Sequence, residues 1–267
     1  MYSGDYSFFD YKYNISGYSG QDYGGLAQYI YLIIAIIGLI LLLWTLRKSS
    51  HDKVHKIIQG LTIFLIAFYI IKTTWESIYD IKLTGSFNTG LLPFDSCSII
   101  MFAGLLAGFS KGKIKEYANC WLVTGGIVGG IATMVYLNAF KYYPFFSFGA
   151  FYSMIWHFLM VFLGLLLMIT NYGSINYQTI IKGFIFHLII SLIVIPIDYI
   201  YNFDFMMYKS LGCIPIFEDI ASSFIQKGIG WLNPFMMLVL YYIAFNIVIL
   251  SFLLFKKLNL CYLLKKS

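Results

Sequence analysis

Charged residues are scarce in this sequence, and their scarcity excludes most soluble folds. Only 11% of the 267 residues are charged and 60% are hydrophobic, whereas a soluble domain carries about 25% charged residues. A soluble interior of this size cannot hide so much apolar surface, but a lipid bilayer favours apolar side chains on every side of a helix. We therefore expect a membrane protein whose main partner is the lipid bilayer.

Arginine and paired cysteines are also scarce. Arg47 is the only arginine, and the lysines stand in short groups between apolar runs, unlike the clustered basic face of a nucleic-acid-binding protein. No nucleic-acid partner is therefore expected. The four cysteines, Cys97, Cys120, Cys213 and Cys261, form no CxxC pair and show no zinc-binding spacing. The sequence predicts no metal site, no cofactor and no disulfide framework.

The apolar runs are long and continuous, without the short alternating segments of a β-barrel. Backbone polar groups inside lipid must be satisfied internally, so these runs are predicted to be helices. The expected fold class is an all-α polytopic membrane helix bundle of about seven transmembrane helices, with six as the alternative if the third is a half-helix. The spans are predicted at about 27–46, 57–73, 93–109, 117–138, 150–170, 179–201 and 232–255.

The distribution of charge predicts how the chain is oriented. Twelve of the 18 basic residues fall on one side of the predicted spans and ten of the twelve acidic residues on the other, and basic loops face the cytoplasm. The N-terminus is therefore expected outside and the C-terminus in the cytoplasm, in the cell (plasma) membrane.

Three regions follow from this orientation. Residues 1–26 form a polar, Tyr/Gly-rich extracytoplasmic segment that is expected to be mobile and to contain no removable signal peptide. Residues 27–256 form a single transmembrane domain, and residues 257–267 form a basic cytoplasmic tail. The sequence leaves the oligomeric state open.

Few ionisable side chains fall inside the predicted spans, and such groups are functional candidates because placing them in lipid is costly. They are Asp95, Cys97, His157, His187 and Asp198. With this topology and a rise of about 1.5 Å per residue, all of them except His187 share one layer in the outer third of the bilayer. His187 is expected in the inner half.

A thiol beside an imidazole is the arrangement that covalent acyl transfer requires. The Cys97 thiolate would be the nucleophile and His157 the base that takes its proton, and Asp198 or Asp95 would orient the imidazole. Each residue also has a plainer interpretation. A buried free cysteine behaves as a small hydrophobic side chain, a histidine in a span often bonds a neighbouring helix, and Asp95 could cap a helix after Pro93.

A family resemblance rests on several short segments in a fixed order. The run Leu92-Pro93-Phe94-Asp95-Ser96-Cys97 is similar to the LPxHxC segment of the YwaF-like family of bacterial integral membrane proteins. The other similar segments are Gly125 to Asn138, Tyr143 to Phe146 with Ser153 to His157, Asp198 to Lys209, and Gly230 to Phe235. Together they cover roughly residues 57–255.

The YwaF-like proteins resemble in turn an animal transmembrane acyltransferase that remodels ether phospholipids. This resemblance implies that Cys97 and His157 are the catalytic pair and that an acyl lipid is the substrate. The chain departs from the family at Asp95, where the family has histidine, and at Asp198 and Asp204, where it has asparagine. The prediction is a lipid acyltransferase or acyl hydrolase with a Cys–His pair; the alternative is a non-enzymatic small-solute transporter or membrane sensor.

Overall fold

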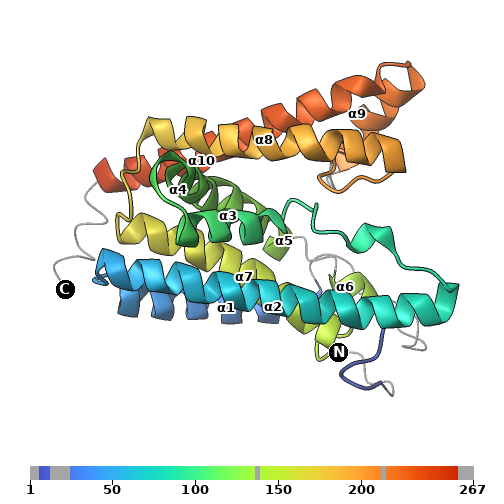
Figure 1. Cartoon of the computed structure of the whole chain (residues 1–267), viewed down its shortest axis with the longest axis horizontal. Coiled ribbons are helices and arrows are strands. Elements are labelled where there is room, and N and C mark those ends of the chain that lie inside the picture. The colour runs from blue at the N-terminus through green and yellow to red at the C-terminus, as the bar shows by residue number, and fades with distance from the viewer. Residues whose placement is uncertain (1–5, 13–24, 136–138, 212–214, 258–267) are drawn as a thin grey trace. The chain divides into compact units, whose positions relative to one another are not determined.

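The regular structure of the protein is helical throughout the residues that the structure describes. The structure is a computed structural model that describes residues 6–12, 25–135, 139–211 and 215–257. The α-helices, labelled in Figure 1, are α1 (Leu26–Leu46), α2 (His51–Thr84), α3 (Ile99–Phe109), α4 (Gly112–Trp121), α5 (Ile127–Val135), α6 (Ala139–Tyr142), α7 (Phe148–Ile169), α8 (Tyr177–Tyr201), α9 (Pro215–Gln226) and α10 (Asn233–Lys257). The predicted all-α fold class is confirmed.

Within the described residues, six helices are long and apolar enough to cross a membrane. They are Leu26–Leu46, His51–Thr84, Gly112–Val135, Phe148–Ile169, Tyr177–Tyr201 and Gly230–Lys257. The third of these joins α4 to α5 through a π-helical segment, η2 (Leu122–Gly126), which is the usual form of a single extra residue inserted in a helix. The last begins with the 3₁₀ turn η3 (Gly230–Leu232).

The third predicted span, 93–109, corresponds to the short helix α3. Its 11 residues rise only about 16 Å, roughly half the thickness of a hydrocarbon core. The segment before it is a series of turns from Leu92 to Ser98, where Pro93 disfavours helix for the residue that precedes it. Among the described residues, six helices are long enough to span the membrane, and the third predicted span is the half-length helix α3. This arrangement is the alternative prediction of six spans with a half-helix.

Helix α2 is longer than the bilayer requires. Its 34 residues rise about 51 Å, against about 30 Å for the hydrocarbon core. Ser50 caps its start by accepting a bond from the Lys53 amide, and Gly85, in the left-handed conformation with φ 74°, ends it. The span predicted at 57–73 is thus the middle of a helix that continues at both ends.

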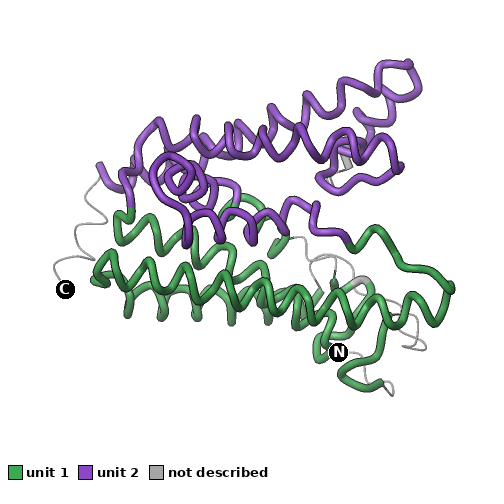
Figure 2. The backbone as a smooth tube through the Cα atoms, viewed as in Figure 1, with its two compact units in different colours: residues 1–91, 126–172 green, residues 92–125, 173–267 purple. Residues whose placement is uncertain are grey.

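Two compact units make up the chain, and they interleave along the sequence (Figure 2). Unit 1 contains Met1–Leu91 and Gly126–Tyr172, and unit 2 contains Leu92–Gly125 and Gly173–Ser267. The single transmembrane domain expected over 27–256 stays a prediction. Most of the expected basic tail, residues 258–267, lies outside the described residues.

Helix α7 is the centre of unit 1 and packs against α1, α2, α5 and α6. The approach of α5 to α7 is close because Gly130 has no side chain. A Cβ atom there would lie 2.6 Å from Val161 Cγ2 and 3.1 Å from the His157 carbonyl oxygen.

Helix α8 is the centre of unit 2 and packs against α4 and α10, while α3 packs against α4. Gly183 allows the close approach of α8 to α4. A Cβ atom at this position would lie 2.4 Å from Thr124 Oγ1 and 3.0 Å from the Cys120 carbonyl oxygen. These contacts position the unit 2 residues that were predicted to carry chemistry.

Candidate functional site

The predicted site residues divide between the two units. Asp95, Cys97 and Asp198 belong to unit 2, and His157 belongs to unit 1. The pairing of Cys97 with His157 therefore stays a prediction.

Cys97 lies in the turns that lead into α3. Its exposure is intermediate, whereas Cys120 is buried; Cys213 and Cys261 lie outside the described residues. The turns are fixed by bonds from the Ser98 amide to the Asp95 carbonyl oxygen, 2.8 Å, and from the Ile100 amide to the Cys97 carbonyl oxygen, 3.4 Å. A half-exposed thiol on a turn is accessible to a reactant in a way that a buried thiol is not.

Asp95 is exposed, and it does not have the capping role considered for it. The N-cap of α3 is Ser98, and no side chain makes a capping hydrogen bond there.

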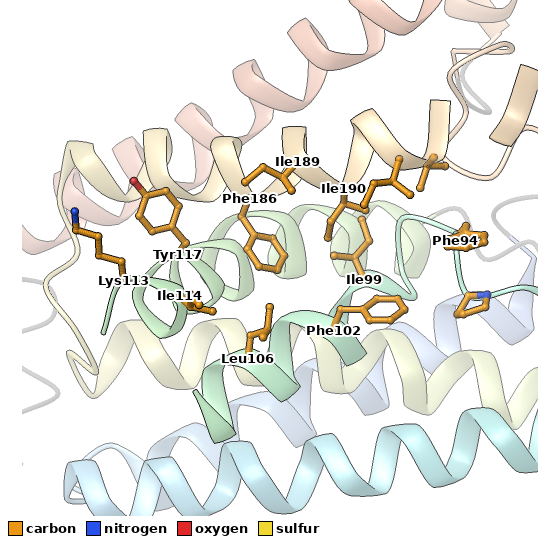
Figure 3. A pocket seen from close by; sticks show the side chains of 13 residues that line it. Phe94, Ile99, Phe102, Leu106, Lys113, Ile114, Tyr117, Phe186, Ile189 and Ile190 are labelled. Carbon is orange, nitrogen blue, oxygen red and sulfur yellow. The ribbon is translucent and has the colours of Figure 1, made fainter. Parts of the chain in front are cut away.

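An apolar groove runs along α3 within unit 2 (Figure 3), and its lining includes Phe94 and Ile99, which flank Cys97 in the sequence. It has a volume of about 530 Å³, inside the range of about 300–1,000 Å³ that is typical of ligand pockets. Its lining residues are Pro93, Phe94, Ile99, Phe102, Leu106, Lys113, Ile114, Tyr117, Phe186, Ile189, Ile190, Ile193 and Val194. Lys113 is the only charged residue among them.

The two ends of this groove differ in chemistry. Phe94 lies at one end and Lys113 at the other, with side chains of α3 and α8 between them (Figure 3). Phe94 makes an edge contact with Phe205, with ring centroids 5.6 Å apart. Phe94 stands three residues before Cys97 in the sequence.

Tyr241 of α10 is buried in the interior of unit 2. Its ring packs against the His187 imidazole with centroids 4.1 Å apart. The Trp121 indole donates to His187 Nδ1 at 3.4 Å. His187, which the depth argument set apart from the other candidates, is thus held between side chains of α4 and α10.

Asp198 lies in the last turn of α8 and organises the loop that follows. It is fully buried, and its Oδ1 accepts a bond from the Phe205 amide at 3.0 Å. Among the described residues its Oδ2 has no hydrogen-bond partner. A buried oxygen without a partner is a costly feature and is often found at a functional site.

The loop after Asp198 is strained. Asn202, Met207 and Leu211 all have positive φ values, between 54° and 60°, a conformation that non-glycine residues adopt only when surrounding contacts impose it. Asp204 holds the turn by accepting bonds from the amides of Lys209, 2.7 Å, and Ser210, 3.0 Å.

Tyr208 of this loop is fully buried, and its hydroxyl is hydrogen-bonded to Ser191 of α8. Burial raises the pKa of Tyr208 well above its usual range, although the Ser191 bond partly opposes the shift. The phenol therefore stays neutral at physiological pH.

His157 lies on the buried face of α7 in unit 1. Its Nδ1 lies 2.7 Å from the Ser153 carbonyl oxygen. Because a carbonyl oxygen can only accept, Nδ1 carries the proton, and Nε2 has the lone pair of a potential base.

A further polar cluster in unit 1 was not predicted from the sequence. Tyr11 is buried, and its hydroxyl donates to Asp80 Oδ1 at 3.0 Å, while Asn88 Nδ2 donates to Asp80 Oδ2 at 3.1 Å. The Trp75 indole donates to the Phe9 carbonyl oxygen at 2.9 Å. Residues 6–12, which were expected to be mobile, therefore pack on α2. The alternation of tyrosine with small residues in this segment did not predict that packing.

No group of three or more metal-binding side chains occurs in the part of the chain that the structure describes.

Six long apolar helices, which expose many large apolar side chains, define this chain as a multi-pass integral membrane protein. The model of the TMEM164 family matches residues 23–256, and the chain belongs to that family. No curated protein and no solved structure matches it.

Proposed function

We propose that this protein acts on acyl lipids, as an acyltransferase or acyl hydrolase, with Cys97 as the nucleophile. The observation that carries the proposal is the apolar groove, which begins at Pro93 and Phe94, directly before the Cys97 turn. An acyl chain lying in this groove would bring its ester carbonyl to the thiol. The proposal agrees with the resemblance to YwaF-like proteins and their acyltransferase relative.

The groove would select a lipid by shape. A lipid tail gains little from leaving one apolar medium for another, so binding depends on van der Waals packing against the walls. Phe102 and Leu106 of α3 face Ile189 and Ile190 of α8 along it (Figure 3). These side chains form a continuous apolar surface along the length of α3.

The proposed orientation places the mouth of the groove toward the outside of the plasma membrane. An N-terminus outside directs the start of α3 toward the outer side and Lys113 toward the cytoplasmic side, and the turns before α3 cover the part of the membrane that this 11-residue helix does not cross. A phospholipid of the outer leaflet would then have its ester near Cys97 and its tail directed toward Lys113. The Lys113 ammonium would end the apolar path at the cytoplasmic interface.

The proposed chemical step is a nucleophilic substitution at the ester carbonyl. The Cys97 thiolate attacks the carbonyl carbon, a C–S bond forms and the ester C–O bond breaks, leaving an acyl thioester and a lysolipid. His157 Nε2 takes the thiol proton and returns it to the departing alkoxide oxygen. An acceptor hydroxyl, or water, then attacks the thioester and releases the thiol.

The carboxylates have distinct proposed parts in this scheme. Asp198 keeps its proposed role of orienting His157. Because the Nδ1 proton already bonds the Ser153 carbonyl oxygen, Asp198 Oδ2, which has no partner among the described residues, would accept from the Nε2–H that forms when His157 takes the thiol proton. Asp95, exposed beside the thiol, is positioned to face the polar part of the lipid.

A thiol-directed lipid probe tests the nucleophile. Protein in nanodiscs is treated with an alkyne-tagged, long-chain acyl phosphonate, and labelling is read on a gel after click attachment of a dye. Wild type and Cys120→Ala should label equally, because Cys120 is buried, whereas Cys97→Ala should lose the label. Labelling that persists in Cys97→Ala overturns the nucleophile assignment and leaves the transporter or sensor class as the better description.

A further inference from the structure

A polar pocket of unit 2 lies between the loop that follows α8 and the helix α9, which is labelled in Figure 1. Its volume is about 480 Å³, within the range of about 300–1,000 Å³ that is typical of ligand pockets. The pocket is built from chain between two membrane spans, Tyr177–Tyr201 and Gly230–Lys257. Its polar lining residues are Asn202, Asp204, Lys209, Ser210, Glu218 and Ser222.

Lys209 is the positive group of this pocket, and the loop holds it in place. Its amide donates to Asp204 Oδ1 at 2.7 Å, and its carbonyl oxygen accepts from Asn233 Nδ2 at 2.8 Å. Its ammonium donates to Asn202 Oδ1 at 2.7 Å and to the Asp198 carbonyl oxygen at 3.4 Å. Because an ammonium has three N–H donors, these two bonds leave one donor for an anionic oxygen of a ligand.

The two carboxylates of the pocket differ in what they can still bind. Both oxygens of Asp204 accept backbone amides, those of Lys209 and Ser210, so this carboxylate is part of the wall. Glu218 of α9 is exposed, and its carboxylate has no hydrogen bond or ion pair with another described residue. Glu218 can therefore pair with a cationic group of a ligand.

A chain of three aromatic rings joins this pocket to the apolar groove. Phe203 lines the pocket, and its ring contacts Phe205 with centroids 4.9 Å apart. Phe205 in turn contacts Phe94, a lining residue of the groove, at 5.6 Å. A ligand can therefore come from two sources: the head group of a lipid whose tail lies in the groove, or a free solute from the water.

We propose that this pocket binds a zwitterion, a molecule whose ammonium group pairs with Glu218 and whose phosphate or carboxylate group accepts the remaining donor of Lys209. A ligand with both charges matches the pocket better than a simple anion, which the carboxylates of Asp204 and Glu218 would repel. The site does not depend on the chemistry proposed for Cys97.

The test compares thermal unfolding with and without defined zwitterions. The protein is placed in nanodiscs of phosphatidylglycerol, whose head group has no ammonium. Phosphoethanolamine or glycine is added in excess from solution, and ethyl phosphate and ethylamine supply each charge alone. A second set of nanodiscs contains phosphatidylethanolamine in place of part of the phosphatidylglycerol.

Four variants separate the pocket from its surroundings. Glu218→Gln removes the free carboxylate and keeps its shape. Asp219→Asn is its matched control, because Asp219 is the next residue of α9, is also exposed and is not among the lining residues. Lys209→Met removes the ammonium, and Lys227→Met, at an exposed lysine that is not among the lining residues, is the control for it.

A ligand that binds only the folded protein raises its Tm. Wild type, Asp219→Asn and Lys227→Met should gain about 3 °C with at least one zwitterion, the shift for a ligand at about ten times its Kd. Glu218→Gln and Lys209→Met should lose most of this gain, because losing one charged contact raises Kd by about tenfold or more. Ethyl phosphate and ethylamine should give smaller gains than phosphoethanolamine.

Each outcome decides a separate point. A gain with phosphoethanolamine or glycine identifies a free zwitterion as a ligand, and a gain with phosphatidylethanolamine alone identifies a lipid head group. No gain with any of the three zwitterions, or equal gains in Glu218→Gln and Asp219→Asn, overturns the proposal. If Lys209→Met does not fold, the comparison of Glu218→Gln with Asp219→Asn decides alone.

This result is separable from the proposed function. Cys97→Ala should keep the full gain in Tm, because Cys97 is not among the lining residues of the pocket. If the lipid probe fails to label Cys97 while a zwitterion still raises Tm, the acyl-lipid proposal fails and the pocket stands. If no zwitterion raises Tm while Cys97 is labelled, the pocket proposal fails and the nucleophile assignment stands.

Discussion

At the scale of single residues, polar side chains in unit 1 are satisfied by partners far away in the sequence. The Tyr11 hydroxyl donates to Asp80, 69 residues further along the chain. The Tyr11 ring also stacks on Tyr79 at 5.4 Å and meets the edge of Trp75 at 5.5 Å. One carboxylate therefore ties the N-terminal segment to the end of a long helix.

Asp80→Ala should release this segment. The change leaves the buried Tyr11 hydroxyl without its acceptor, at a cost of about 1–3 kcal/mol. Hydrogen exchange of the amides in residues 6–12 should accelerate at least tenfold. Asp219→Ala, which removes an exposed carboxylate on α9, serves as control, and equal exchange in the two variants would contradict the account.

The sequence predicted the residue types of the candidate site better than their connections. Cys97 and Asp198 were singled out because ionisable groups in spans are rare. Tyr241 could not be singled out, because it is one of 23 tyrosines in an apolar helix without periodicity. Its ring contact with His187, 54 residues away in the chain, depends on packing that no local pattern encodes.

At the scale of helices, close packing depends on small residues at defined positions. The glycine-rich stretch around Gly130 and the single Gly183 both let two helices approach until a Cβ atom would clash. Small residues at contact points are the usual way in which membrane helices associate. Unit 2 depends on Gly183 in particular, because α8 is its central helix.

Gly183→Ala should destabilise the protein by about 1–3 kcal/mol, since overpacking forces the backbone of α4 to move. Gly60→Ala is the matched control: a Cβ atom there meets nothing within 4 Å, and alanine favours helix by about 1 kcal/mol. Thermal unfolding in detergent should show a lower Tm for Gly183→Ala and an unchanged or higher Tm for Gly60→Ala. A Gly183→Ala protein as stable as wild type would contradict the proposed contact.

The long helices were predictable from continuous apolar runs, whereas two features were not. The extension of α2 to Thr84 passes through Lys72, Glu76 and Asp80, which end an apolar run by composition but do not end a helix. The turns before α3 arise where Pro93 and the residues that follow leave the helical conformation, and apolar composition alone does not reveal this.

At the scale of the whole chain, the proposed orientation can be tested through the length of α2. About 20 Å of this helix exceeds the hydrocarbon thickness, so its ends should emerge into water on opposite sides. Lys53 and Lys82 are both exposed and lie near these ends.

Single cysteines at these two positions, with the four native cysteines changed to Ala, should report opposite sides of the membrane. In intact cells a membrane-impermeant maleimide should label Lys82→Cys, and it should label Lys53→Cys only after permeabilisation. Phe64→Cys, in the middle of the helix, should resist labelling in both states. Labelling of Lys53→Cys in intact cells would reverse the proposed orientation.

The central proposal, that Cys97 accepts an acyl group from a lipid in the groove beside it, is tested most directly by mass spectrometry. Purified protein is incubated with phospholipid vesicles, digested, and examined for a fatty-acyl mass on the peptide that contains Cys97. The account predicts a hydroxylamine-sensitive thioester on Cys97 that is absent from Cys97→Ala and reduced in His157→Gln. A Cys97 peptide that remains unmodified under turnover with every phospholipid class supplied would contradict it.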